Sequence, residues 1–171
     1  MHISNWMTLL QRQSAANEPI TWNELIVGYD FGLLKQADIQ AWVRCHGFRG
    51  RACEKLAGLE GADLESFEAT FWEACRECTG KLPRPGGTRW SAAQDRWRLA
   101  LIRDALQADL TSEALAVILE SIWERVGCPE DMIGLWRSGA PWEKRKATVD
   151  YEALHDFLRK RQKDDGDLVP A

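Results

Sequence analysis

The sequence has few of the residue types on which enzymes rely for acid–base chemistry. Only three of its 171 residues are histidines, namely His2, His46 and His155, although histidine is the side chain most often used for proton transfer near neutral pH. It contains no Gly-x-Ser-x-Gly nucleophile motif, and its glycines at residues 80–88 stand in the wrong order for a phosphate-binding loop. We therefore predict a protein that is not an enzyme, with no catalytic residues and no cofactor.

Long apolar runs and a secretion signal are also missing. No stretch reaches the roughly 20 apolar residues of a membrane span, and residues 1–6 lack the basic and apolar regions of a signal peptide. The five cysteines are an odd number, which suits a reducing compartment. We therefore expect a cytoplasmic protein without a membrane partner. The formal net charge of −4 disfavours nucleic acid, because phosphate binding uses clustered lysines and arginines.

Strand-type alternation is almost absent, and helical periodicity runs through nearly the whole chain. Hydrophobic residues make up 45% of the composition, which is enough for a core in an ordinary globular protein. We expect most of the nine tryptophans to be buried, as large aromatic side chains usually are. The sequence therefore predicts an all-α fold, a single compact multi-helix bundle of about seven to nine helices.

Several helix ends can be read from short motifs. Residues 21–24, Thr-Trp-Asn-Glu, form a capping box at a helix start, and Gly32 is a natural helix stop. Helical spacing continues over residues 36–46, and a long helix runs from about Ser91 to Ala108 with apolar residues on several sides. Further predicted helix starts lie at Thr111 or Ser112, at Pro129 and at Asp150.

The main interruption lies at residues 80–88, where two prolines and three glycines oppose regular structure. We expect one all-α domain over residues 1–163, and a subdivision near residues 80–88 is the alternative. The polar residues 164–171 are predicted to form a flexible tail.

Cys75 and Cys78 form the first candidate chemical site, with His46 as a further ligand. A structural zinc site needs a second such pair or histidines at set spacing, and the other thiols are scattered. Both cysteines also continue the apolar stripe of the preceding helix, and free cysteine commonly packs as a small hydrophobe. We therefore predict no metal ligands. A metal-binding or enzymatic protein that uses Cys75, Cys78 and His46 is the alternative.

Arg49 and Arg51 lie between two short predicted helices, as basic residues do in some helix-turn-helix proteins. The following helix would need further basic residues to recognise DNA, but Glu54 and Glu60 flank Lys55. A nucleic-acid-binding regulator is therefore a third hypothesis.

Residues 136–146 form the candidate binding segment, because tryptophan and arginine dominate the energetic centres of protein interfaces. In the other interpretation Trp136 belongs to the core and Trp142 packs over a loop. We predict a non-enzymatic protein that binds a protein partner, and the sequence does not give its oligomeric state. The predicted contact residues are Trp136, Arg137, Trp142, Lys144 and Arg145.

Two stretches resemble a bacterial family described as domain of unknown function 2247. One is residues 20–39, with its tryptophan helix and glycine stop, and the other is residues 122–133, with its Cys-Pro-Glu-Asp-Met-Ile segment. The likeness spans roughly residues 20–142 and departs from the family at Trp136-Arg137, where an aromatic–aliphatic pair is usual. The resemblance implies a helical fold and no particular activity. By analogy, small helical bacterial proteins of this kind resemble immunity proteins, which makes a toxin one candidate partner.

Overall fold

The structure is a computed structural model that describes residues 5–13, 19–46, 50–59, 61–137 and 147–164. Over these ranges it contains eight α-helices, one 3₁₀ helix and no strand, which confirms the predicted all-α fold class. An isolated antiparallel bridge joins Trp136 and Val149.

The chain divides into two units, residues 1–97 and 98–171. The boundary lies inside the longest helix, α6 (Thr88–Gln107), and so differs from both the single domain over residues 1–163 and the subdivision near residues 80–88 that we expected. Residues 81–87 do form an irregular connection. They do not end the first unit, because Trp97, on the far side of them, donates its indole N–H to the carbonyl oxygen of Glu24 at 2.8 Å. Residues 165–171, predicted as a tail, lie outside the described ranges.

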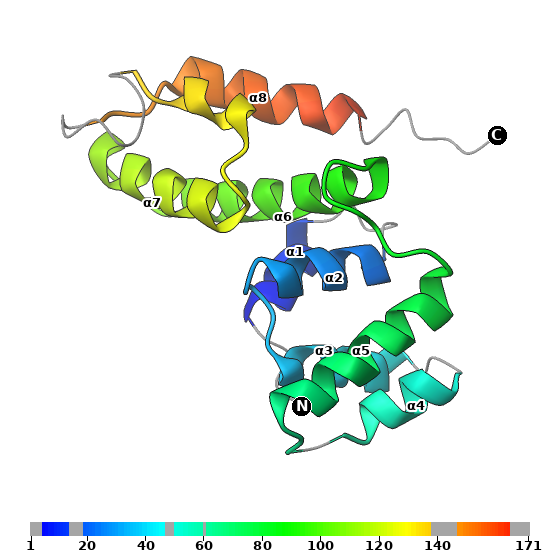
Figure 1. Cartoon of the computed structure of the whole chain (residues 1–171). Helices are drawn as coiled ribbons and strands as arrows, with labels where there is room; N and C mark the ends of the chain where they lie inside the picture. The colour runs from blue at the N-terminus through cyan, green and yellow to red at the C-terminus, as the bar shows by residue number, and fades with distance from the viewer. Residues whose placement is uncertain (1–4, 14–18, 47–49, 60, 138–146, 165–171) are drawn as a thin grey trace. The chain divides into compact units, whose positions relative to one another are not determined.

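Where the structure describes it, the first unit contains five complete helices and the first half of α6 (Figure 1). α4 packs against α3 and α5, and α2 packs against α5. The side chains at its centre are almost fully buried, among them Leu25, Ile39, Leu56, Phe67, Phe71 and Trp97. The five helices are α1 (Asn5–Gln13), α2 (Trp22–Asp30), α3 (Gln36–His46), α4 (Arg51–Ala57) and α5 (Leu64–Thr79).

α2 begins at the predicted capping box. The Thr21 hydroxyl oxygen accepts the Asn23 N–H at 3.2 Å, and the Thr21 N–H donates to Glu24 Oε2 at 2.7 Å. Glu24 is only 5% exposed, and its other oxygen lies 3.1 Å from Arg96 Nη1. The cap thus also pairs a buried carboxylate with the first half of α6.

The start of α4 is capped by a side chain from α5. The Glu77 carboxylate accepts the N–H groups of Arg51 at 3.1 Å and Ala52 at 2.9 Å. Gly50 has φ 156°, and a Cβ atom there would lie 2.8 Å from the Glu77 carboxyl carbon. A glycine at this position therefore lets the carboxylate reach the helix end.

The second unit contains the other half of α6, α7 (Ser112–Arg125), the 3₁₀ helix η1 (Glu130–Leu135) and α8 (Tyr151–Asp164). Thr111 caps α7 by accepting the Ala114 N–H at 3.2 Å, as its position in the sequence predicts. Pro129 precedes a 3₁₀ helix, where the sequence led us to expect a helix without distinguishing its type. η1 packs against α8, and Leu119, Met132 and Leu154 are fully buried.

Candidate functional site

Trp136, the first predicted contact residue, lies in the core of the second unit. It is 6% exposed, and its indole N–H donates to the Ala116 carbonyl oxygen of α7 at 3.3 Å. This burial leaves the indole almost no surface to offer a partner directly. The interpretation of Trp136 as core, which the sequence left open, agrees with this position.

Trp136 also begins a junction that holds two distant parts of the chain together. The Arg137 N–H donates to the Thr148 carbonyl oxygen at 3.0 Å, and the Asp150 N–H donates to the Leu135 carbonyl oxygen at 2.9 Å. These two bonds flank the Trp136–Val149 bridge. We call residues 135–137 and 148–150 the clamp. The chain leaves the clamp at Arg137 and returns to it at Thr148.

The clamp is attached to the start of α7 and to the start of α8. The Val149 N–H donates to the Ser112 hydroxyl oxygen at 3.0 Å, and the Ala153 N–H donates to Asp150 Oδ1 at 3.2 Å. Arg137 is exposed, and its Nε lies 3.4 Å from Asp150 Oδ2. The Ala153 N–H and the Arg137 charge lower the pKa of Asp150 below its ordinary value of 3.8.

Of the five predicted contact residues, Trp136 and Arg137 are therefore brought together at one end of the clamp. Trp142, Lys144 and Arg145 lie outside the described residues. No structural position is assigned to these three.

The 3₁₀ helix that leads into the clamp is fixed by an arginine–carboxylate cluster. Arg98, 5% exposed, donates from Nη1 and Nη2 to the two oxygens of Asp131 at 2.7 and 3.1 Å. Arg161 of α8 also donates to Asp131, and both guanidinium groups lie over the Phe157 ring, at 5.2 and 4.0 Å from its centroid. Bidentate and stacked arginines are well-ordered pairs, so this cluster holds η1 against α6 and α8 within the second unit.

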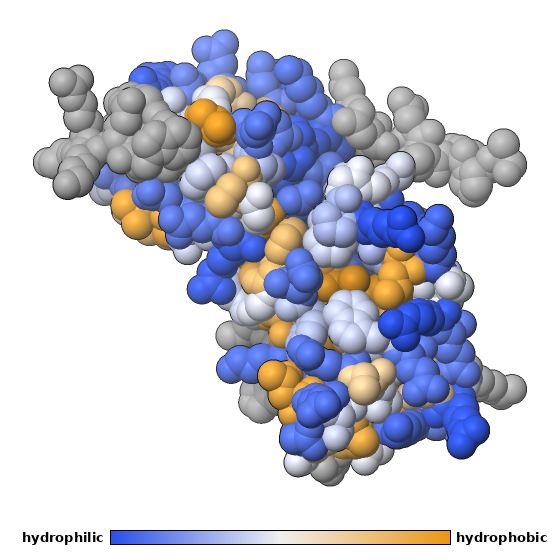
Figure 2. All heavy atoms as spheres, viewed as in Figure 1, coloured by the Kyte–Doolittle hydropathy of each residue, from blue (hydrophilic) through white to orange (hydrophobic). Residues whose placement is uncertain are grey.

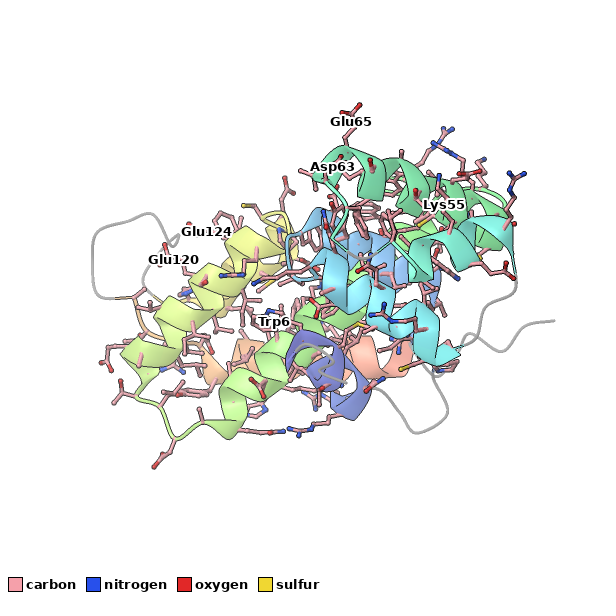
Figure 3. All side chains as sticks on the ribbon, turned by 90° about the horizontal axis from the view of Figure 1, so that it is seen from below. Trp6, Lys55, Asp63, Glu65, Glu120 and Glu124 are labelled. Atoms are coloured by element: carbon pink, nitrogen blue, oxygen red, sulfur yellow. The ribbon has the colours of Figure 1, made fainter. Side chains whose placement is uncertain are left out.

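α7 has an exposed face that the sequence pattern did not single out. Val117 is 65% exposed, and its neighbours at four-residue spacing, Glu113 and Ser121, are exposed as well. Glu120 and Glu124 lie one turn apart on the same helix (Figure 3). A single exposed valine is ordinary for a protein surface, and on the face drawn in Figure 2 hydrophobic residues occur in several small groups. We therefore propose no binding site on this face of α7.

His46, the third residue of the metal-binding alternative, lies at the end of α3. The His46 ring stacks on Trp42, and its Nδ1 lies 2.9 Å from the Trp42 carbonyl oxygen. Within the described ranges, no group of three or more His, Cys, Asp or Glu residues is placed to hold a metal ion. The thiol that does approach Cys78 belongs to Cys53, with the two Sγ atoms 3.0 Å apart.

Burial governs the chemistry of these thiols. Cys53 and Cys75 are both fully buried. Burial, together with the contact with Cys78, raises the pKa of Cys53 to about 12, and burial also raises the pKa of Cys75. Both therefore remain protonated at neutral pH, whereas the nucleophilic form of cysteine is the thiolate.

Of the two arginines in the nucleic-acid hypothesis, the structure describes only Arg51. Arg49 lies outside the described residues, and Arg51 is exposed at the start of α4. The backbone N–H of Arg51 is bound by the Glu77 carboxylate, which places a negative charge beside this arginine.

Comparisons of the chain with protein-family models, curated proteins and solved structures found no match. The resemblance to the family of unknown function therefore stays a prediction. Among the helices of the described ranges, none has the length and apolarity needed to cross a membrane.

Proposed function

We propose that this protein binds a protein partner through the segment that the clamp holds at both ends. Trp142, Lys144 and Arg145 are the proposed contact residues, Arg137 lies at the edge of the contact, and Trp136 anchors the segment. The observation that supports the proposal is the pairing of Arg137 with Thr148. Fixing both ends of a binding segment lowers the entropy lost when it engages a partner.

The charge of the segment defines the partner we propose. Residues 137–146 contain four basic side chains and one acidic side chain, in a chain whose formal net charge is −4. A local basic group of this kind favours an acidic surface and speeds association with it. Tryptophan adds the large apolar contact typical of an interface centre. The partner is therefore a protein with an acidic surface beside an apolar pocket.

The specific form of the proposal is an immunity protein that covers the active site of a toxin. It depends on the family resemblance and on the analogy with small helical bacterial proteins. The direct experiment is co-expression with the product of any toxin gene next to this one. Growth should be restored by the wild-type chain and not by a Lys144→Glu/Arg145→Glu variant.

A capture experiment tests the broader proposal. Tagged wild-type chain is incubated with nuclease-treated extract of the native host, and the bound proteins are identified by mass spectrometry. One protein should be retained by the wild type and lost with both Trp142→Ala and Lys144→Glu/Arg145→Glu. Lys55→Glu/Arg84→Glu carries the same charge change at exposed positions of the first unit and should retain it. Lys55 lies on α4 (Figure 3).

Two results would contradict the proposal. One is a partner whose retention is equally reduced by the control variant, because the effect would then follow net charge alone. The other is binding that disappears with nuclease treatment, which would favour the nucleic-acid hypothesis instead.

A further inference from the structure

Two thiols from different helices meet inside the first unit. Cys53 lies in the first turn of α4, Cys78 lies in the last turn of α5, and their Sγ atoms are 3.0 Å apart. Both cysteines are free. A disulfide bond requires about 2.05 Å, so the two sulfur atoms need to approach by only about 1 Å.

The surrounding contacts keep this approach in place. Glu77, the residue before Cys78, binds the N–H groups at the start of α4, next to Cys53. α4 also packs along α5. The pair of sulfur atoms is therefore held by a helix–helix contact and by a carboxylate cap.

We propose that Cys53 and Cys78 form a reversible dithiol–disulfide site that is oxidised by low-molecular-weight disulfides such as glutathione disulfide. The site lies entirely within the first unit, and it does not depend on the proposed partner-binding function.

Solvent access sets the order of the reaction. Cys78 is partly exposed and Cys53 is fully buried, so the Cys78 thiolate attacks the small disulfide. A Cys78–glutathione bond forms, the glutathione disulfide bond breaks, and one glutathione leaves as a thiolate that takes up a proton.

Cys53 completes the exchange. Cys53 rests as the protonated thiol and becomes the nucleophile only as it gives up its proton. Its sulfur then attacks Cys78 Sγ, the mixed disulfide breaks, and the second glutathione departs with that proton. One protein dithiol and one glutathione disulfide thus become one protein disulfide and two glutathione thiols, which balances both electrons and protons.

The test uses the full chain with Cys45→Ser and Cys128→Ser, because Cys45 and Cys128 are exposed and would form adducts of their own. The folded protein is incubated with glutathione disulfide, and the remaining thiols are alkylated after denaturation. Before alkylation, we expect the intact mass to fall by two hydrogen atoms and the thiol reductant dithiothreitol to reverse the change. After alkylation, the oxidised protein should carry one alkyl group, on Cys75.

Trypsin distinguishes the three possible pairings, because it cleaves after Arg51, Lys55, Arg76 and Lys81. Cys53 is then in the peptide of residues 52–55, Cys75 in residues 56–76 and Cys78 in residues 77–81. The proposal requires a cross-link between residues 52–55 and 77–81, with Cys75 alkylated. A cross-link that includes residues 56–76, a persistent glutathione adduct, or no cross-link would overturn it.

Single variants in the same background give a second measurement. Cys75→Ser should still form the cross-link. Cys53→Ser should instead accumulate glutathione on Cys78, because the resolving thiol is gone. Oxidation should raise the Tm by on the order of 10 °C, since the cross-link restricts the unfolded chain. An unchanged Tm together with a cross-link formed only after denaturation would also overturn the proposal.

Discussion

Gly28 lies so close to the Trp97 indole that a larger residue at position 28 would clash with the ring. A Cβ atom on Gly28 would lie 2.6 Å from Trp97 Cζ2 and 3.0 Å from Leu34 Cδ1. Trp97 is fully buried and its N–H is bound to Glu24, so the ring has little room to move. The glycine is therefore required by packing.

We expect Gly28→Ala to lower the free energy of unfolding by about 1–3 kcal/mol, because overpacking exceeds the gain in helix propensity. Chemical denaturation followed by circular dichroism measures the change. Gly134→Ala is the matched control, since a Cβ atom there meets nothing within 4 Å, and its effect should stay within about 0.5 kcal/mol. Equal effects of the two variants would show that the contact with Trp97 is not the cause.

Residue-level prediction from the sequence succeeded where a local pattern was sufficient. The apolar stripe of α5 correctly predicted a buried Cys75. The meeting of Cys53 with Cys78 was missed, because it depends on how α4 packs against α5 across 25 residues of chain. Trp136 is of a residue type that is common at interface centres, and only the folded structure shows that it is buried, with its N–H bound to Ala116.

The start of α4 depends on another element. Its N-cap, Gly50, makes no side-chain hydrogen bond, and Glu77 of α5 binds the first N–H groups instead. The cap therefore stabilises the short helix and its contact with α5 together.

Glu77→Ala should destabilise the protein by about 1 kcal/mol, as the loss of a helix cap usually does, and should speed hydrogen exchange at the amides of α4. Glu73→Ala removes an exposed carboxylate one turn earlier on the same helix and should leave α4 exchange unchanged. If Glu73→Ala speeds hydrogen exchange in α4 as much as Glu77→Ala does, the cause is the loss of a carboxylate from α5 in general, and the loss of the α4 cap is not the cause.

Asp150 directly precedes α8, and it both caps the helix and pairs with Arg137. Because the pKa of this carboxyl is lowered in the folded state, its stabilising contribution is present above the ordinary value of 3.8 and is lost as pH falls through the lowered pKa. Protection of the Arg137 and Ala153 amides from hydrogen exchange, measured relative to the intrinsic exchange rate at each pH, should therefore fall with acidification in that range.

Asp150→Asn should keep the cap, because asparagine also accepts from backbone N–H groups, while it loses the charge pair and the acid dependence at these two amides. Asp150→Ala should lose both the cap and the pair at every pH. An asparagine variant with the acid dependence of the wild type would assign that dependence to another carboxyl group.

Helix starts with a local cap were predictable, as at Thr21, Thr111 and Asp150. Residues 36–46 were predicted from periodicity alone, and they match α3. The clamp was not predictable, because its hydrogen bonds join residues more than ten positions apart.

The whole chain is built from two units that share one continuous helix. Breaking α6 between Trp97 and Arg98 would leave backbone N–H and carbonyl groups without helical partners. We therefore expect the two units to unfold in a single cooperative transition, measured by calorimetry and by circular dichroism.

Gly28→Ala in the first unit and Trp136→Phe in the second test this expectation. Trp136→Phe loses the bond to Ala116 and part of a buried side chain, which should cost about 1–2 kcal/mol. Each variant should shift the entire transition to lower temperature. Two resolved transitions, with each variant moving only one of them, would show that α6 does not couple the units.

The sequence predicted the fold class of the whole molecule. For the domains it predicted one unit over residues 1–163, with the prolines and glycines of residues 80–88 as the alternative place for a subdivision. Such residues indicate where a helix cannot continue. They do not indicate which helices pack together, and the indole of Trp97 extends the first unit beyond them.

The clamp has a practical consequence for engineering. Its backbone hydrogen bonds keep Arg137 and Thr148 paired by main-chain atoms, so the pairing does not require any particular side chain between them. The ten intervening residues, 138–147, can be exchanged as a cassette, and a foreign epitope or an affinity tag placed there would be displayed from a fixed stem.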